Sequence, residues 1–311
     1  MAVFYKYTGN LGANFFKKPT AKISIPYYLN DPFESETGDN LVTVIESAIV
    51  QNNKFLSRDK IKIALNGLIN SNGIFSVSET PRNPLMWSHY AEQHNGFCIG
   101  FNEDLFSGMR KSTSNSSGFL EYKPTKVFYD SYRFDRQTSV RGTKESNNAL
   151  KRHLLTKSDE WIYEKEHRCI LPFIGADRIY INKKNKLVYS YLAPKTHIDS
   201  IIKVFVNEGK IIEKGRGEYE FAQGVITESD VELFSSFGCV SFLYDINPKH
   251  IDSIYIGLRV DNKTTKAIYR LINSEKMSLS HIKLFKFRLS TKRFELLPDV
   301  VDKEYISNLQ K

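Results

Sequence analysis

The stretch that most constrains the fold is Lys157–Phe173, where a charged segment runs directly into an apolar one. Its end, Cys169–Phe173, has the length and composition of a buried strand. If that strand already begins near Tyr163, the alternation of side chains places three charged residues on one face: Glu164, Glu166 and Arg168. The sequence therefore predicts two carboxylates and a guanidinium at the entrance of a core strand. The alternative is an ordinary solvated pair of Arg and Glu.

Composition narrows the class of protein. The 311 residues include 44 Lys and Arg against 35 Asp and Glu, for a formal net charge of +9. This charge favours acidic partners such as nucleic acid, but it says nothing about the fold. Cys98, Cys169 and Cys239 are far apart, which predicts buried free thiols in a reducing compartment. We expect a cytoplasmic protein without a membrane partner, because no apolar stretch is long enough to cross a bilayer and the start lacks a signal-peptide layout.

Strand-like and helix-like segments are interspersed without a regular strand–helix–strand rhythm, which predicts an α+β fold with a mixed sheet flanked by helices. The expected strands are 3–7, 21–28, 73–78, 97–101, 125–129, 169–173, 251–257, 282–289 and 293–297. The expected helices are 39–54, 57–69, 85–90, 147–155 and 263–274. We expect a single domain over 1–311, in which 177–245 forms an insertion or a β-rich elaboration. Its expected strands are 179–181, 187–191, 201–206 and 219–225.

The signatures of several common enzyme classes are missing. Seven His residues are scattered and no paired-Cys spacing occurs, so no metal site is expected. The chain has no phosphate-binding glycine loop, nucleophile elbow or kinase signature. Function therefore has to be sought in less familiar patterns.

Four clusters of aromatic and polar residues each lie beside a predicted strand. They are Tyr5-Lys6-Tyr7, Asn30-Asp31-Pro32-Phe33, Trp87-Ser88-His89-Tyr90 with His94, and Trp161 to Arg168. For any one cluster, packing is the ordinary explanation, because large aromatic side chains are mostly buried. Four clusters at strand edges favour a shared cleft lined by rings and charges. Such a cleft suits a ligand with a flat ring and a charged or hydroxylated tail.

Together these motifs resemble one widespread bacterial family of proteins of unknown function. The resemblance rests on Y-K-Y, N-D-P-F, S-x-S-E, W-S-H-Y with H-x-G-F-C-I-G-F, W-x-Y-E-x-E-x-R and the late I-D-S-I-Y-I-G. These motifs span most of the chain except about 177–245. Members of that family are often found near mobile-element and phage-defence genes, which implies a role in bacterial defence.

A second set of residues is similar to the motif of ADP-ribosyltransferases. These enzymes use a split, mixed sheet with a basic residue or His on the first strand, a Ser or Tyr on a middle strand, and a late Glu, often in an E-x-E pair. The matching residues occur here in the same order: Lys6, then Ser76 or Ser78 and Tyr90, then Glu164 and Glu166. Lys6 stands where the usual residue is Arg or His. The resemblance implies an ADP-ribosyltransferase-like fold with NAD as the substrate.

The resemblance also implies roles for these residues. Glu166 would orient the ribose and stabilise the oxocarbenium-like centre that forms when the bond to nicotinamide breaks. Glu164 would orient or deprotonate the nucleophile. Tyr and Trp rings would stack on the nicotinamide, and Lys6 or Arg168 would meet the pyrophosphate, unless Arg168 instead holds Glu166. The predicted NAD-binding residues are Tyr5, Lys6, Tyr7, Asn30, Asp31, Ser76, Trp87, Ser88, Tyr90, His94 and Arg168.

The basic surface with many aromatics suits single-stranded nucleic acid, RNA before DNA, and the lysine-rich turn 182–186 is one expected contact. Our first interpretation is a toxin of a phage-defence or toxin–antitoxin system that ADP-ribosylates nucleic acid or protein and is neutralised by an antitoxin protein. Two alternatives stay open. One is a non-enzymatic defence protein that binds nucleic acid or a partner. The other is a nuclease or glycosidase that uses Glu164 and Glu166.

Overall fold

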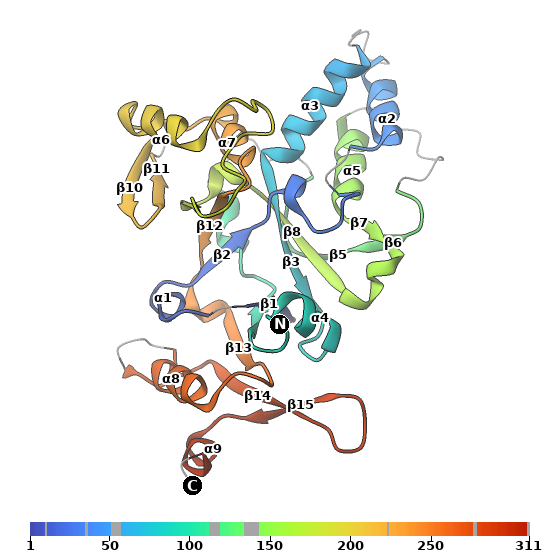
Figure 1. The fold of residues 1–311 in the computed structure, drawn as a ribbon. Helices are drawn as coiled ribbons and strands as arrows, with labels where there is room; N and C mark the ends of the chain where they lie inside the picture. Colours follow the sequence, from blue (N-terminus) through green and yellow to red (C-terminus); the bar gives the residue numbers. More distant parts are fainter. Residues whose placement is uncertain are drawn as a thin grey trace.

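The computed structural model describes residues 1–9, 11–34, 37–50, 57–111, 119–133, 143–222, 224–275 and 279–309. Over these residues the chain forms a mixed α/β fold with a large sheet, a smaller second sheet and helices packed around them (Figure 1). A short parallel pair, β6 (Phe128–Asp130) and β7 (Thr156–Ser158), belongs to neither sheet. The predicted mixed sheet flanked by helices is thus confirmed.

The larger sheet has eight strands in the order β15-β14-β13-β4-β1-β3-β8-β5. Its neighbours are antiparallel except β13 and β14, which are parallel and are joined through helix α8 (Asn262–Ile272). A parallel pair needs such a crossover connection. The strands are β1 (Val3–Thr8), β3 (Asn72–Ser78), β4 (Phe97–Asn102), β5 (Glu121–Lys126), β8 (Glu166–Pro172), β13 (Ile251–Ile256), β14 (Lys283–Leu289) and β15 (Leu296–Val300).

The smaller sheet has five strands in the order β10-β11-β9-β12-β2. Strand β2 (Thr20–Ile23) comes from the N-terminal part of the chain and pairs with β12. Residues 177–245 therefore share their sheet with a distant segment. Within 177–245 lie β9 (Arg178–Ile181), α6 (Ile198–Asn207), β10 (Ile211–Gly215), β11 (Glu218–Phe221), α7 (Glu228–Ser235) and β12 (Val240–Asp245).

The larger sheet is split between β1 and β3. These neighbours pair at a single register position, Tyr5 with Ser78, whereas β1 and β4 pair along their whole length. Beyond that position β3 turns to another partner, because Ser24 and Ile74 exchange two backbone hydrogen bonds of 2.9 Å. The end of β2 thus enters the split, and this opening positions the candidate site.

Both sheets pack against one hydrophobic core. Phe173 directly follows β8, and Phe242 lies in β12. Their rings stack with the centroids 3.9 Å apart. Cys169 and Leu171 of β8 point into this core and are fully buried. The apolar run that the sequence marked as a core strand therefore lies between the two sheets.

The opposite face of β8 meets a second core, to which Ile170 contributes. Because side chains alternate along a strand, Glu166 and Arg168 project on the same side as Ile170. This side is covered by three helices: α2 (Asp39–Val50), α3 (Arg58–Asn70) and α5 (Thr143–Leu154).

The remaining helices are α1 (Ala13–Lys17), α4 (Pro84–Tyr90) and α9 (Lys303–Asn308). Helix α4 begins one residue before the predicted helix 85–90, because the Asn83 side chain accepts a hydrogen bond from the Leu85 amide and Pro84 occupies the first helical position. In the described part of the chain, no helix is long and apolar enough to span a membrane.

Most differences from the predicted elements fall within 177–245. The segment 201–206 is helix α6 rather than a strand, because Ile198, Ile202 and Phe205 form a helical stripe that is buried on one side. Residues 187–191 contain only an isolated bridge, from Tyr189 to His197. Helix α7 and strands β10 and β12 carried no clear pattern and were not predicted.

Two further strands are shorter than expected. The strand predicted over 21–28 ends at Ile23, and a 3-10 helix begins at Pro26, whose fixed φ favours that turn. The strand predicted over 125–129 is divided between β5 and β6. For the helix expected over 39–54, residues 51–54 lie outside the described part of the chain.

Candidate active site

The split between β1 and β3 opens into a cavity of about 300 Å³. Its lining comes from β1, the loop after β2, β3, helix α4 and the start of β8. Most of the residues that the sequence predicts for a site lie here: Tyr5, Lys6, Tyr7, Asn30, Ser76, Tyr90, Glu164, Glu166 and Arg168. Residues from distant parts of the chain thus share one cavity.

Glu166 begins β8 and is held by Arg168. The Arg168 Nε donates a hydrogen bond of 2.8 Å to Glu166 Oε1, and Nη2 donates one of 3.1 Å to Oε2. Arg168 also donates to the Leu154 carbonyl at 2.7 Å and pairs with Glu34. Only 1% of Arg168 is exposed. Its guanidinium is thus committed to these partners, and of the two roles expected for it, positioning Glu166 fits this geometry.

Lys157 joins the two carboxylates. Its Nζ lies 2.6 Å from Glu164 Oε2 and 3.3 Å from Glu166 Oε2, and all three side chains are buried. Burial by itself would lower the pKa of Lys157, but the charges of Glu166, Glu34 and Glu164 outweigh it and raise the pKa. The ammonium therefore stays protonated between its partners.

Glu164 reaches the cavity from a turn and not from a strand. Residues Asp159–Glu164 form a 3-10 helix, and Lys165 then adopts a left-handed conformation with φ 47° and ψ 49°. The prediction that β8 begins near Tyr163 is therefore wrong, since the strand begins at Glu166. This single left-handed residue reverses the local course of the chain, so that both carboxylates still reach Lys157.

Tyr90 and Asn30 complete the surroundings of Glu164. The Tyr90 hydroxyl donates a hydrogen bond of 2.6 Å to Glu164 Oε1. Burial and this carboxylate raise the pKa of Tyr90 above its usual range, although a hydrogen bond with the Asn30 side chain acts in the other direction. The phenol thus remains a proton donor, and each Glu164 oxygen has one partner and one lone pair to spare.

Glu166 is an ionised carboxylate under all physiological conditions. Burial by itself would raise its pKa, but the charges of Arg168 and Lys157, with hydrogen bonds from Arg168 and Ser76, lower the pKa to about 2. A group with this pKa cannot exchange protons efficiently near neutral pH. Glu166 can therefore act through its negative charge and its acceptor oxygens.

Lys6 reaches across the split. Its Nζ donates a hydrogen bond of 2.8 Å to the Ser76 carbonyl and lies 5.1 Å from the centre of the Phe75 ring. Burial lowers the pKa of Lys6 to about 8, although the charge of Glu166 opposes this shift. Lys6 is therefore mostly charged at neutral pH and loses its charge under mildly alkaline conditions.

Four of the predicted NAD-binding residues do not line this cavity. Trp87 is fully buried, donates to the Pro81 carbonyl at 2.7 Å and packs edge-on against Tyr7. These contacts make the Trp87 ring part of the hydrophobic core, so it cannot stack on a ligand in the cavity. The four residues are Asp31, Trp87, Ser88 and His94.

Asp31, Ser88 and His94, the other three predicted residues that do not line the cavity, have different surroundings. His94 stacks parallel to Trp87, with ring centroids 6.4 Å apart, and Ser88 is exposed on helix α4. Asp31 is buried and accepts a hydrogen bond of 2.9 Å from the Phe33 amide, which is the turn chemistry that the sequence indicates for Asp before Pro.

The cavity also contains residues to which the sequence assigned no role. Lys157 opens the stretch that we singled out, but only the 3-10 turn brings it back to Glu166, nine positions later. Glu34 directly follows the N-D-P-F turn, and that proximity was the one available signal. The other unassigned charged or hydroxyl-bearing lining residues are Lys22, Ser24 and Tyr28. Ser78, the alternative to Ser76 in the predicted motif, also lines the cavity and donates a hydrogen bond of 2.7 Å to the Glu164 carbonyl.

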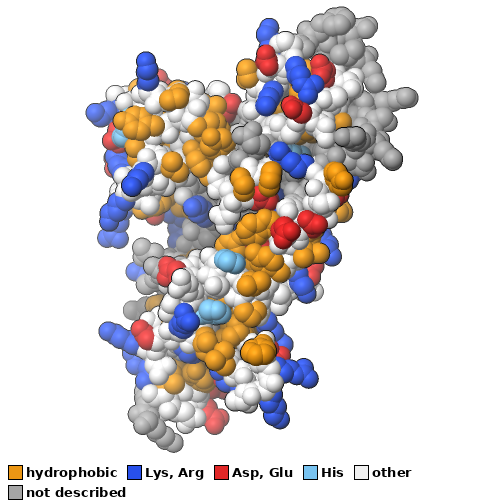
Figure 2. Space-filling model, turned by 45° about the vertical axis from the view of Figure 1, so that its right-hand side comes forward, with side chains coloured by type: hydrophobic (Ala, Val, Ile, Leu, Met, Phe, Trp, Pro, Cys, Tyr) orange, Lys and Arg blue, Asp and Glu red, His pale blue; other side chains and the backbone are white. Residues whose placement is uncertain are grey.

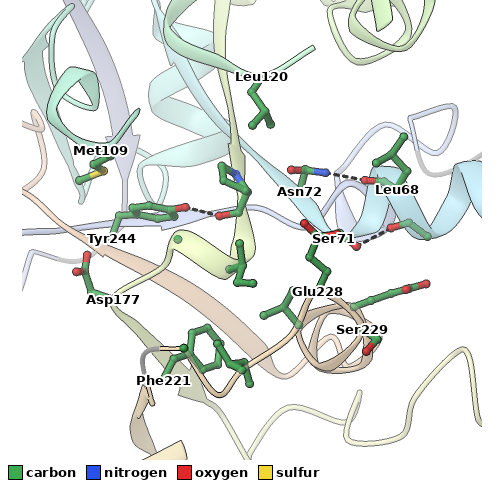
Figure 3. Close-up of a pocket in the computed structure, with 18 of the residues that line it drawn as sticks. Leu68, Ser71, Asn72, Met109, Leu120, Asp177, Phe221, Glu228, Ser229 and Tyr244 are labelled. Carbon is green, nitrogen blue, oxygen red and sulfur yellow. Dashed lines mark hydrogen bonds between the residues drawn. The ribbon is translucent and has the colours of Figure 1, made fainter. Parts of the chain in front are cut away.

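A larger cavity of about 910 Å³ lies elsewhere, and its lining residues come from α3, the start of β3, α7 and β12 (Figure 3). There the Tyr244 hydroxyl donates to the Pro172 carbonyl, while Asp177 and Glu228 are exposed. No lining residue is a cation, and none of the predicted site residues is present. Buried titratable groups with shifted pKa values cluster at functional sites, which favours the smaller cavity. Among the described residues, no three His, Cys, Asp or Glu side chains are grouped to hold a metal ion.

A family model described as a protein of unknown function (DUF2971) matches residues 86–169. The matched segment runs from helix α4 to β8 and includes Glu164, Glu166 and Arg168. Comparison with curated proteins and with solved structures gives no match. Over this segment the chain is thus similar to a family without an assigned function, whereas the motifs near Tyr5 and Asn30 lie outside the match.

Proposed function

We propose that this protein is an ADP-ribosyltransferase-like enzyme that uses NAD. One observation carries the proposal: Lys6, Ser76 and Glu166 lie on β1, β3 and β8, three consecutive strands of the split sheet, and line one cavity. A basic residue, a Ser and a Glu from an E-x-E pair are the motif of ADP-ribosyltransferases, in this order. A simple ion pair explains Glu166 with Arg168, but it leaves the convergence with Lys6 unexplained.

The polar lining fits the parts of NAD. Lys6, at the lip of the split, offers a cation to the pyrophosphate. The aromatic side chains that line the cavity are Tyr5, Tyr7, Tyr28 and Tyr90, so of the Tyr and Trp rings expected to stack on nicotinamide only tyrosine rings are available. Glu166 is buried in the lining, and its acceptor oxygens suit ribose hydroxyls.

Glu166 already receives hydrogen bonds from Arg168, Lys157 and Ser76. A carboxylate offers about four acceptor sites. A ribose hydroxyl would therefore replace one of these partners, and Ser76, the one without a charge, is the weakest of them.

In the proposed reaction, the bond between the nicotinamide nitrogen and C1′ of the ribose breaks, and its electron pair leaves with neutral nicotinamide. Positive charge then develops on the ribose. The fixed charge of Glu166 stabilises this charge in a site where little solvent screens it. An acceptor nucleophile attacks C1′ and passes its proton to Glu164, which has lone pairs free beside Tyr90 and Lys157.

The test uses NAD labelled in its adenine half. We expect the wild-type protein to release nicotinamide and to transfer the label. Glu166→Gln should slow nicotinamide release by about 100-fold or more, as for the loss of a preorganised electrostatic contact. The matched control is Glu160→Gln, because Glu160 is exposed on the 3-10 helix that precedes β8. If folded Glu166→Gln releases nicotinamide at the wild-type rate, the assignment is wrong.

The same assay separates the related activities. A glycosidase acting on NAD would release nicotinamide and leave the label on free ADP-ribose. A non-enzymatic binding protein would release no nicotinamide, and its biological effect would persist in Glu166→Gln.

The proposal extends to a toxin of a bacterial defence system that acts in the cytoplasm. Support comes from the resemblance to a family found near phage-defence genes, and from three buried cysteines without disulfides, which fit a reducing compartment. We expect expression of the wild-type chain to arrest bacterial growth and expression of Glu166→Gln to be tolerated. Growth arrest of equal strength by both would rule out the enzymatic toxin.

A further inference from the structure

We propose that a basic groove beside the candidate cavity binds the phosphates of a single-stranded nucleic acid, and that this strand is the acceptor of the reaction. The role as acceptor rests on the proposed function, whereas binding of the strand does not. The groove has a volume of about 630 Å³ and lies between β1, α1, β2 and β4, with side chains from the smaller sheet at one side.

The groove concentrates positive charge. On the face shown in Figure 2, Lys and Arg side chains are spread over both ends of the molecule, so the net charge alone marks no site. In the groove, by contrast, five cationic side chains face a single carboxylate, Glu218. The cations are Lys6, Lys17, Lys18, Lys22 and Arg178.

Three of these cations lack a carboxylate partner. Arg178 pairs with Glu218 and Asp245, and Lys18 also pairs with Asp245, at 2.8 Å. Among the described residues, no carboxylate oxygen lies within the 4.0 Å of an ion pair from the ammonium groups of Lys6, Lys17 and Lys22.

Two of these three cations, Lys6 and Lys22, repel each other. Burial lowers the pKa of Lys22. Burial is also the main cause of the lowered pKa of Lys6; the charge of Glu166 opposes this shift, and the charge of Lys22 adds to it. A phosphate placed between them would relieve this repulsion, which a neutral ligand could not do. The groove is therefore suited to an anion with more than one charge.

The groove leads directly into the candidate cavity. Four residues line both: Lys6, Tyr7, Lys22 and Ser24. From this shared end the groove continues to Lys17 and Lys18 at α1. A chain of phosphates lying along the lysines would thus bring one nucleotide to Glu164 and Glu166.

The shape favours a single strand. A cavity of this volume, set between strands, can take one extended chain, whereas a double helix is too wide to enter it. Phe15 lies in the wall and is only partly buried, so the rest of its ring offers a surface on which a base can stack. The lysine-rich turn 182–186 contributes no residue to the lining of the groove, and Lys183 pairs with Asp199 at 2.7 Å.

The experiment measures binding without NAD, by fluorescence anisotropy of a labelled single-stranded RNA of mixed sequence. The test variant is Lys17→Ala/Lys22→Ala. The matched control, Lys60→Ala/Lys203→Ala, removes the same charge from α3 and α6, outside the groove. We expect the test variant to weaken binding by about tenfold and to reduce the slope of log Kd against log salt by about 1.4, at about 0.7 per phosphate contact. The control should match the wild type.

Three outcomes overturn the groove assignment. Equal affinity of the test and control variants for the single-stranded RNA would contradict it. Tighter binding of the matching duplex would also contradict it. Complete displacement of the RNA by ADP-ribose assigns the groove to the phosphates of NAD instead. If the wild type binds RNA but releases no nicotinamide from NAD, the proposed function fails and the groove stands. If it releases nicotinamide but binds no strand, the groove proposal fails alone and a protein acceptor takes its place.

Discussion

The Lys6 ammonium donates a hydrogen bond of 2.8 Å to the Ser76 carbonyl, across the split between β1 and β3. In an unbroken sheet, a backbone amide of the neighbouring strand would satisfy such a carbonyl. Here a side chain takes that place, and the same ammonium lines both the candidate cavity and the basic groove. The opening of the sheet is thereby linked to a group that titrates near physiological pH.

The first prediction concerns the affinity for phosphates as pH rises. Burial lowers the pKa of Lys6 to about 8, with the charge of Glu166 opposing it, so the ammonium loses its proton above that pH. We expect the Kd for ADP-ribose to rise as pH increases from 7 to 9. Lys6→Arg should bind without this pH dependence, because arginine stays charged. Parallel pH profiles for the two proteins would show that Lys6 does not contact phosphate.

The lowered pKa of Lys6 also makes the stability of the fold depend on pH. Its folded pKa lies below the ordinary value of 10.5, so between about 8 and 10.5 the unfolded chain binds more protons at this group than the folded chain. The contribution of Lys6 to stability therefore rises with pH over this window. We expect the free energy of unfolding in urea to change more favourably from pH 7.5 to 9.5 for the wild type than for Lys6→Met, because Met does not titrate.

The second prediction concerns acid. The folded pKa of Glu166 is about 2, below its ordinary value of 4.5, because Arg168 and Lys157 outweigh the effect of burial. Stability from this group is fully present above about pH 5 and is lost as pH falls towards 2, by up to about 3 kcal/mol. Urea unfolding between pH 7 and 3 should show a shallower fall for Glu166→Gln than for wild type. Identical slopes would contradict the prediction.

The third prediction concerns Arg168, which compensates Glu34 and Glu166 in a buried setting. Arg168→Met leaves both carboxylates without their guanidinium, and breaking a buried pair in this way costs about 3–5 kcal/mol. The free energy of unfolding in urea at pH 7 measures the loss. Arg152→Met on the exposed side of α5 is the matched control and should lie close to wild type. Similar losses in both variants would mean that the buried pair is not responsible.

The fourth prediction concerns Lys157, whose ammonium separates Glu164 from Glu166. In Lys157→Met, two carboxylates share a buried site without a cation between them, so one of them should take up a proton near neutral pH. The variant should be much less stable than wild type at pH 7 and should recover part of the difference at pH 5. Lys165→Met, between the two glutamates but exposed, should show no such recovery. A deficit that does not change with pH would point to lost packing instead.

Local patterns were sufficient for most of the regular elements around the site. Period-2 alternation and apolar runs identified β1, β3, β4, the core of β8 and β13, and helical spacing identified α3 and α8. These elements have strong amphipathic or buried patterns. Helix α4 begins at Pro84, one residue before the predicted helix 85–90, because Asn83 caps it. Short elements without such patterns, such as β10, β12 and α7, were missed, and of these β12 depends on pairing with the distant strand β2.

Within the site, the sequence by itself determined the chemistry, because residue types set charge and hydrogen bonding. It indicated that Glu164, Glu166, Lys6 and Ser76 belong together. The tertiary structure alone decided which groups meet: the left-handed Lys165 turns Glu164 inwards. It also buried Trp87 in the core, away from any ligand in the cavity.

The Lys157–Phe173 stretch shows why the sequence determines some features of the site and the tertiary structure decides others. Its alternation is a local property, and it correctly placed the apolar end in the core. Glu34, however, reaches Arg168 from a segment 134 positions away in the chain, and Lys157 reaches Glu166 because the 3-10 turn folds back the nine positions between them. No local period encodes such contacts, because they depend on how the turn and the distant segments fold together.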